Sequence, residues 1–150
     1  DEKTNVNISS RRRRSCLDIK APQFLTLTKD GAMEAQKNDL DLGDEDKNMD
    51  LIICINMIHV SPWDATIGLF QLASQKLRPG GILYFYGPYK VNGKTAPTNL
   101  AFDASLKSRD PSWGIRDLED VITVAEQKGL KFDKMIEMPV NNWSIIFVNE

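Results

Sequence analysis

Polar residues that could act in catalysis or ligand binding follow directly after an apolar run in the middle of the chain. Leu51 to Ile55 is apolar without alternation, which is typical of a strand covered on both faces of a parallel sheet. Asn56 and His59 come next, at the expected carboxyl end of that strand, where open α/β sheets bind their ligands. A neutral imidazole can take a proton from a nucleophile, and an amide can contact a ligand. These residues predict a ligand site at this strand end.

Each of these residues also has a structural interpretation. The amide of Asn56 could instead satisfy backbone groups at the strand end. His59, the only histidine, could form hydrogen bonds around the start of the next helix instead of acting as a catalytic base. Trp63 could stack on a flat substrate or pack against the sheet. Further candidates for the substrate side lie near expected strand ends: Tyr86, Lys90 and Asn141.

The elements that must position these residues begin with a strand, a helix and a second strand. Ser61 to Asp64 offers an N-cap hydroxyl, a proline at the first helical position and an early acid. The turn at 79–81, Pro-Gly-Gly, is expected to end that helix and reverse the chain. Ile82 to Tyr86 would then be the second strand, which makes a βαβ unit with parallel strands.

Two more helices and a hairpin are expected in the remaining chain. Thr98 starts a short helix that uses Leu100, Phe102 and Leu106, and a second helix runs from Asp117 to Gly129. Strands at 131–138 and 143–148 have a short connection, which requires antiparallel pairing. The predicted fold class is α/β: a partial doubly wound, Rossmann-like, mostly parallel sheet with a C-terminal antiparallel hairpin.

The chain divides by composition near residue 48. Residues 1–48 are expected to be a divergent or poorly ordered N-terminal segment, in which Leu17 to Ile19 and Phe24 to Thr28 could be short strands. Residues 49–150 carry the strands and helices described above. The run Arg11 to Arg14 could be an import or phosphate-contacting patch, although a solvated charge run is the simpler interpretation.

Composition restricts the classes of function. The chain has 150 residues, 41% of them hydrophobic, which favours one globular domain. Its net charge of −2 gives no reason to expect a general nucleic-acid or membrane-surface binder. The longest apolar run is too short to cross a bilayer. The residues show no zinc-ligand spacing, Walker loop or catalytic-triad order, so no metal site is predicted. We expect a cytoplasmic protein, with the nucleus as an alternative location.

Several motifs resemble the methyltransferase-like protein twenty-six family, a poorly characterised group with the class I S-adenosylmethionine-dependent methyltransferase fold. The resemblance covers about residues 50–150. It implies S-adenosylmethionine as cofactor, contacted by Asn56, Met57 and Ile58, and an unknown small-molecule or protein substrate. The motifs are 55–63 (Ile-Asn-Met-Ile-His-Val-Ser-Pro-Trp), 78–81 (Arg-Pro-Gly-Gly), 86–88 (Tyr-Gly-Pro), 96–103 (Ala-Pro-Thr-Asn-Leu-Ala-Phe-Asp), 113–117 (Trp-Gly-Ile-Arg-Asp) and 138–142 (Met-Pro-Val-Asn-Asn).

The chain departs from that family in its front part. Class members hold the cofactor with a glycine-rich loop after the first strand and an acid at the end of the second, and neither precedes Asp50. The sequence therefore predicts the carboxyl-terminal part of the fold, truncated or divergent at its front, with impaired cofactor binding and an inactive chain. The alternative is a non-catalytic interaction module that retains the second half of the fold. An exposed sheet edge could also lead to self-association.

Overall fold

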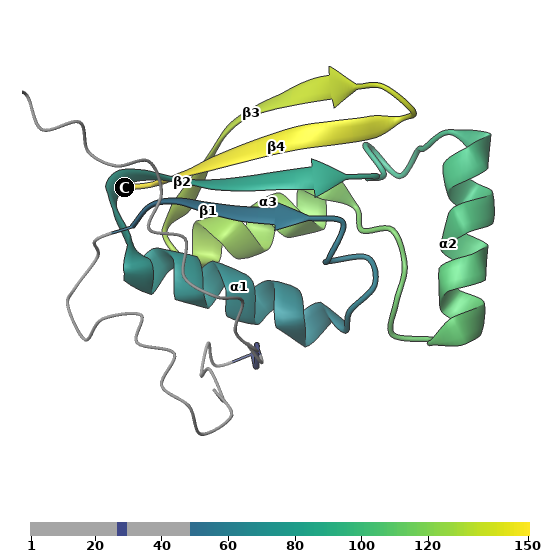
Figure 1. Ribbon diagram of the computed structural model, residues 1–150, viewed down its shortest axis with the longest axis horizontal. Helices are drawn as coiled ribbons and strands as arrows, with labels where there is room; N and C mark the ends of the chain where they lie inside the picture. The colour runs from purple at the N-terminus through teal and green to yellow at the C-terminus, as the bar shows by residue number, and fades with distance from the viewer. Residues whose placement is uncertain (1–26, 30–48) are drawn as a thin grey trace, which may run out of the picture.

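The computed structural model describes residues 27–29 and 49–150 (Figure 1). The expectations for 1–26 and 30–48 lie outside the described residues, including Leu17 to Ile19, the four arginines and the division at residue 48. Leu27 and Thr28, the described part of one expected strand, are not part of the four-stranded sheet. The elements are β1 (Met49–Ile55), α1 (Trp63–Lys76), β2 (Leu77–Gly87), α2 (Pro97–Arg109), α3 (Leu118–Gln127), β3 (Leu130–Met138) and β4 (Asn142–Asn149).

The four strands form one mixed sheet in the order β1-β2-β4-β3. β1 pairs with β2 in parallel, which confirms the strand–helix–strand prediction. β4 lies between β2 and β3 and is antiparallel to both, which confirms the hairpin. The predicted mostly parallel sheet is corrected, because only one of these three described pairings is parallel.

One hydrophobic core lies between the sheet and the helices α1 and α3; in Figure 1, α1 lies below the sheet and α3 lies partly behind β1. At its centre, Phe70 of α1 packs against Phe85 of β2 and Phe147 of β4, with ring centroids 5.4 and 5.3 Å away. All three side chains are almost completely buried. Because burial of one such ring contributes about 1.5–3 kcal/mol, this cluster is a main attachment of α1 to the sheet.

The prediction that Leu51 to Ile55 is covered on both faces was wrong. Leu51, Ile53 and Ile55 are 49%, 58% and 57% exposed, while Cys54 is buried. The reason is that α1 and α3 pack on the same face of the sheet, and β1 is the edge strand of the described sheet. The partly exposed Ile82 of β2, which pairs with Leu51, extends this apolar surface, called here the open face.

The ends of α1 also differ from the prediction. The N-cap position is Pro62, without a side-chain capping bond, and Ser61 Oγ donates to the backbone oxygen of Met57 instead. The helix ends at Lys76, and β2 starts at the next residue. The Pro-Gly-Gly turn therefore lies inside the range of β2, where the β1–β2 register shifts.

α2 stands across the carboxyl ends of β1 and β2 (Figure 1). It starts at Pro97, one residue before the predicted Thr98. Leu106 is buried as expected, but Leu100 and Phe102 are 54% and 41% exposed, so the predicted apolar face is only partly used for packing. α3 begins after Asp117 and is followed by Gly129 at φ +79°, as predicted. Among the described helices, none combines the length and apolar character needed to cross a membrane.

Gly68 in α1 lets the short segment at residues 27–29 lie directly on the helix. A Cβ atom at this position would be 2.1 Å from the backbone oxygen of Thr28, much closer than the van der Waals radii of the two atoms allow. Backbone rather than a flexible side chain blocks that space. The absence of a side chain at Gly68 is therefore a packing requirement of this contact.

We predict that Gly68→Ala lowers the free energy of unfolding, although glycine to alanine inside a helix ordinarily stabilises by about 1 kcal/mol. The added methyl group must displace Thr28 or shift α1. Urea denaturation of the full chain measures the effect, with Gln75→Ala, at an exposed position of the same helix, as the control. An increase in stability for Gly68→Ala would show that Thr28 does not pack here.

Candidate functional site

Asn56 and His59 meet at Gly87, where β1 and β2 end side by side. The backbone N–H of Asn56 donates to the oxygen of Tyr86 over 2.9 Å, which extends the parallel pairing by one residue. A Cβ atom at Gly87 would lie 3.2 Å from Asn56 Oδ1 and 3.3 Å from His59 Cε1. The structure thus brings these two predicted residues together at the carboxyl edge of the sheet.

The backbone of Asn56 has a left-handed conformation, with φ of +53°. Asparagine adopts this region more readily than other side chains that carry a Cβ atom. The turn ends β1 and leaves the Asn56 side chain exposed while the chain continues into the loop that carries His59. The conformation therefore directs an accessible amide to the strand end.

The loop that carries His59 is held by the segment before α3. Gly114 N–H donates to the backbone oxygen of His59 over 3.0 Å. Arg116 donates from Nε to the oxygen of Ile58 over 3.0 Å, and from Nη2 to the oxygens of Ser61 and Ser112 over 2.7 and 2.9 Å. One guanidinium group therefore fixes both ends of the turn around His59.

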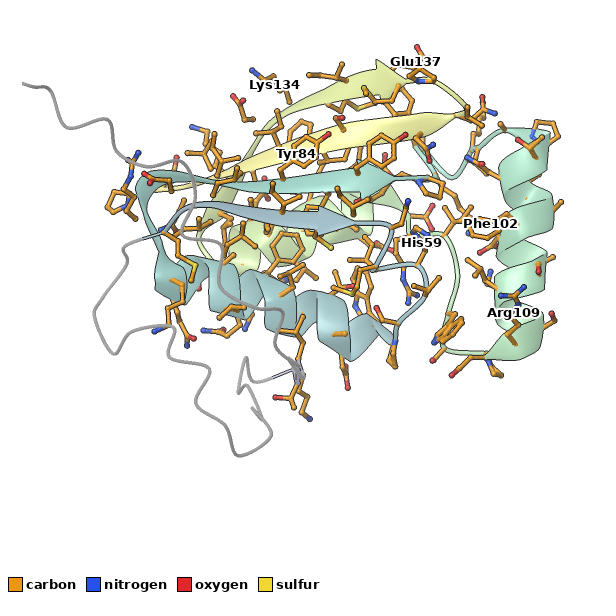
Figure 2. All side chains as sticks on the ribbon, in the orientation of Figure 1. His59, Tyr84, Phe102, Arg109, Lys134 and Glu137 are labelled. Atoms are coloured by element: carbon orange, nitrogen blue, oxygen red, sulfur yellow. The ribbon has the colours of Figure 1, made fainter. Side chains whose placement is uncertain are left out.

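His59 is buried, with 3% of its surface exposed. Burial lowers the pKa of its imidazole, and the positive charge of Arg116 lowers that pKa further, so the ring is neutral at pH 7. Within residues 27–29 and 49–150 no group hydrogen-bonds to the ring; Ser61 and Arg116 make the hydrogen bonds around the helix start instead. Phe102 of α2 meets the ring edge-on at 5.7 Å (Figure 2). The neutral ring can accept a proton.

Lys90 belongs to a cluster around the buried carboxylate of Asp103. Ile115 N–H and Lys107 Nζ each donate to it over 2.7 Å, and Lys90 Nζ lies 3.6 Å away. Burial alone would raise the pKa of Asp103, but the hydrogen bonds from Lys107 and Ile115 and the two lysine charges hold it below its ordinary value. Lys90 therefore forms an ion pair with Asp103 that joins the loop after β2 to α2.

The other predicted substrate residues lie at two separate places on the surface, one around Trp63 and one around Tyr86 and Asn141. Trp63 stacks under the guanidinium of Arg116, 5.4 Å from its ring centroid, beside a hollow of about 300 Å³. Tyr86 accepts a hydrogen bond from Asn142, and Asn141 donates to Thr98 at the start of α2. Asn141 lines a cavity of about 120 Å³. These residues surround the sheet edge without sharing one described cavity with His59.

A larger groove of about 620 Å³ runs along β1 on the side of α1. Met57 lines it, whereas Ile58 is buried in the core. Among the described lining residues, the polar side chains are the Ser61 hydroxyl and the Cys54 thiol. Burial raises the pKa of that thiol to about 12. The remaining lining residues are Leu27, Ile52, Ile53, Ile55, Ala65, Leu69 and Leu72. Among the described residues that line this groove, none has a charged side chain.

Some residues that shape the site were not predicted. The motifs at 113–117 and 96–103 contain Arg116 and Asp103, but the sequence alone assigns a role to neither residue. In the sequence, Gly87 directly follows the predicted strand Ile82 to Tyr86, and a glycine at this place is a usable signal of close approach by another group. The contact between Phe102 and His59 joins residues distant in the chain, and a single sequence carries no sign of it.

Comparisons with known proteins give one family match and several solved structures with a similar fold. A family described as "Protein of unknown function (DUF938)" matches residues 2–149. An O-methyltransferase family 2 protein from Planctomyces limnophilus, solved with apigenin, matches 73% of this chain with a TM-score of 0.60 and 18% identity. CalO1, a methyltransferase of calicheamicin biosynthesis solved with SAH, matches 67% with 0.58 and 11%, and the pyocyanin biosynthetic protein PhzM matches 69% with 0.58 and 13%.

At these identities the comparisons show a methyltransferase-like fold. The match covers 34%, 30% and 31% of those three proteins, so this chain spans about a third of their length.

We predict that this chain loses stability as the pH falls below about 6.5, the ordinary pKa of histidine. The folded pKa of His59 is lowered, so the unfolded chain binds the proton first and stability rises with pH across this window. The slope is at most about 1.4 kcal/mol per pH unit. Urea denaturation between pH 5.5 and 8 measures it, and His59→Gln should flatten it because the chain has one histidine. An unchanged slope in that variant would contradict the lowered pKa.

Proposed function

We propose, for a chain that belongs to the DUF938 family of proteins of unknown function, that residues 49–150 form the acceptor-side half of an S-adenosylmethionine-dependent methyltransferase domain. The observation that carries the proposal is the meeting of Asn56 and His59 at Gly87, at the carboxyl ends of two parallel strands. Open α/β sheets bind their ligands at this edge. The finer assignment to the methyltransferase-like protein twenty-six family rests on the motifs and is part of the proposal.

In this proposal the two residues have different tasks. Methyl transfer depends mainly on the alignment of nucleophile and methyl group, and S-adenosylmethionine supplies an already activated methyl group. The exposed amide of Asn56 positions a ligand at the strand end. The neutral His59, held in place by Arg116, accepts a proton from the acceptor. Phe102 limits the approach to the ring from the side of α2.

The described residues do not fit the whole cofactor. S-adenosylmethionine carries a sulfonium, an amino acid group and a ribose diol, and each needs charged or hydrogen-bonding partners when it leaves water. The groove along β1 offers only a hydroxyl and a protonated thiol among its lining side chains. We therefore propose that the chain by itself binds the cofactor weakly and is inactive alone.

A non-catalytic interaction module is the second candidate. The observation that favours it is the apolar strand β1, whose side chains Leu51, Ile53 and Ile55 are about half exposed. Surfaces of this kind mark interaction sites in soluble proteins. This candidate and the first differ in whether S-adenosylmethionine contacts the strand end at all.

An NMR titration of the full chain with S-adenosylmethionine tests both candidates. We expect a dissociation constant near or above 1 mM, or about −4 kcal/mol, with shifted amide signals at Asn56, Met57 and Gly87. Binding in the micromolar range would show that the chain holds a complete cofactor site. No shift at these residues at saturating cofactor would remove the methyltransferase proposal for this edge and leave the interaction module.

Asn56→Gly tests the amide itself, because glycine keeps the left-handed backbone and its N–H group while it removes the side chain. Loss of one hydrogen bond of about 1 kcal/mol should weaken the residual binding about fivefold. Asn92→Gly is the matched control, since Asn92 is exposed and has φ of +52° in a different loop. Equal weakening by both variants, or by neither, would take Asn56 out of the site.

A further inference from the structure

Phe102 covers the imidazole of His59 with a ring that is itself open to solvent. The two rings meet edge-on with centroids 5.7 Å apart, where α2 faces the strand ends (Figure 2). His59 is buried, whereas Phe102 is 41% exposed and is not part of the hydrophobic core. Phe102 therefore separates the imidazole from solvent on the side of α2 without being fixed by core packing.

The helix that carries Phe102 is anchored by its neighbours on α2. Asp103 and Leu106 are both buried, and Ile115 N–H donates to the Asp103 carboxylate over 2.7 Å. Exposed side chains change rotamer within nanoseconds. The Phe102 ring can therefore turn away from the imidazole while α2 stays in place.

The nitrogens of the imidazole are not sealed from solvent. Thr66 Oγ1 is the one polar side-chain atom of the described residues that is both fully buried and without a hydrogen-bond partner. The His59 nitrogens also lack a partner within these residues, so each keeps some contact with solvent. A ligand that takes the place of the Phe102 ring can therefore reach a nitrogen of His59.

We propose that Phe102 determines which methyl acceptor binds, and that this acceptor is a flat aromatic ring with a hydroxyl group that lies between Phe102 and His59. The inference rests on the proposed function in calling this ligand the methyl acceptor. The exposed surface beside the imidazole is apolar, since Val60 and Phe102 are 37% and 41% exposed. The exposed amide of Asn56 offers a polar contact at the same strand end.

The aromatic contact between Phe102 and His59 is the reason for this choice of ligand. Turning the Phe102 ring away breaks that contact, and an aromatic ligand replaces it with a ring contact of its own. An aliphatic ligand of the same size restores no such contact, which corresponds to about a two- to tenfold difference in the dissociation constant.

The chemistry of the base favours the same ligand. The hydroxyl proton passes to a nitrogen of the neutral imidazole, and the oxygen keeps the electron pair of the broken O–H bond. Because burial lowers the pKa of His59, the imidazole is a weak base. A phenol has the acidity of a tyrosine side chain, with a pKa of about 10, and gives its proton to a weak base more readily than an alcohol does.

An NMR titration of the full chain with phenol, in the absence of cofactor, tests the proposal. The chain has one histidine, so the imidazole Cε1–H signal reports on His59 alone. We expect phenol to shift this signal and the Gly87 amide signal at millimolar concentration. Cyclohexanol, which has a similar size and a hydroxyl group but no aromatic ring, should bind about two- to tenfold more weakly.

Variants at position 102 test the selecting residue. Phe102→Leu keeps an apolar side chain without the aromatic ring, so it should weaken phenol binding about two- to tenfold, whereas Phe102→Tyr should retain it. Leu100→Ala is the matched control, because Leu100 is an exposed apolar residue of the same helix. Circular dichroism verifies that each variant keeps the fold.

Equal binding of phenol and cyclohexanol, or no shift of the His59 signal, would overturn the proposal. Equal phenol binding by Phe102→Leu and the original chain would also overturn it. The phenol titration contains no cofactor, so its outcome is separate from that of the S-adenosylmethionine titration. A chain that binds phenol at His59 but shows no cofactor contact would keep the aromatic site and lose the methyltransferase proposal, and the opposite result would do the reverse.

Discussion

The parallel pairing of β1 with β2 is the constraint on which the rest of the structure depends. Parallel neighbours need a crossover, and α1 provides it by packing Phe70 against Phe85 and Phe147 on one face of the sheet. The same pairing makes both strands end at one edge. Asn56 and Gly87 are neighbours across the strands for this reason, and the candidate site follows from the sheet topology.

Arg116 converts this arrangement into a defined site. Its guanidinium is partly buried, and the backbone oxygens of Ile58, Ser61 and Ser112 satisfy its donors. An arginine is suited to this role because its planar group offers several donors in fixed directions. Burial is the main cause of the lowered pKa of His59, and the charge of Arg116 lowers that pKa further, so the residue that positions the imidazole also helps to keep it neutral. Lysine could not reproduce this set of hydrogen bonds.

The elements of the fold could be predicted from the sequence because their signals are local. Proline and glycine punctuation and helical spacing located α1, α3 and the hairpin to within a few residues. Which elements cover a strand depends on tertiary packing. The apolar sequence of Leu51 to Ile55 is compatible with packing on one face or on both. Ser61 does not cap α1 for a related reason: its hydroxyl donates to the backbone oxygen of Met57 instead, a contact that the sequence does not reveal. The roles of Phe102 and Arg116 arise from contacts between segments distant in the chain.

The groove along β1 and the carboxyl end of that strand differ in polarity. Among the described residues, the side chains that line the groove offer a hydroxyl and a protonated thiol as polar groups. The strand end instead brings the Asn56 amide and the His59 imidazole together at Gly87. Because a charged or strongly polar ligand group needs such partners when it leaves water, the described residues can meet that need at the strand end and not along the groove.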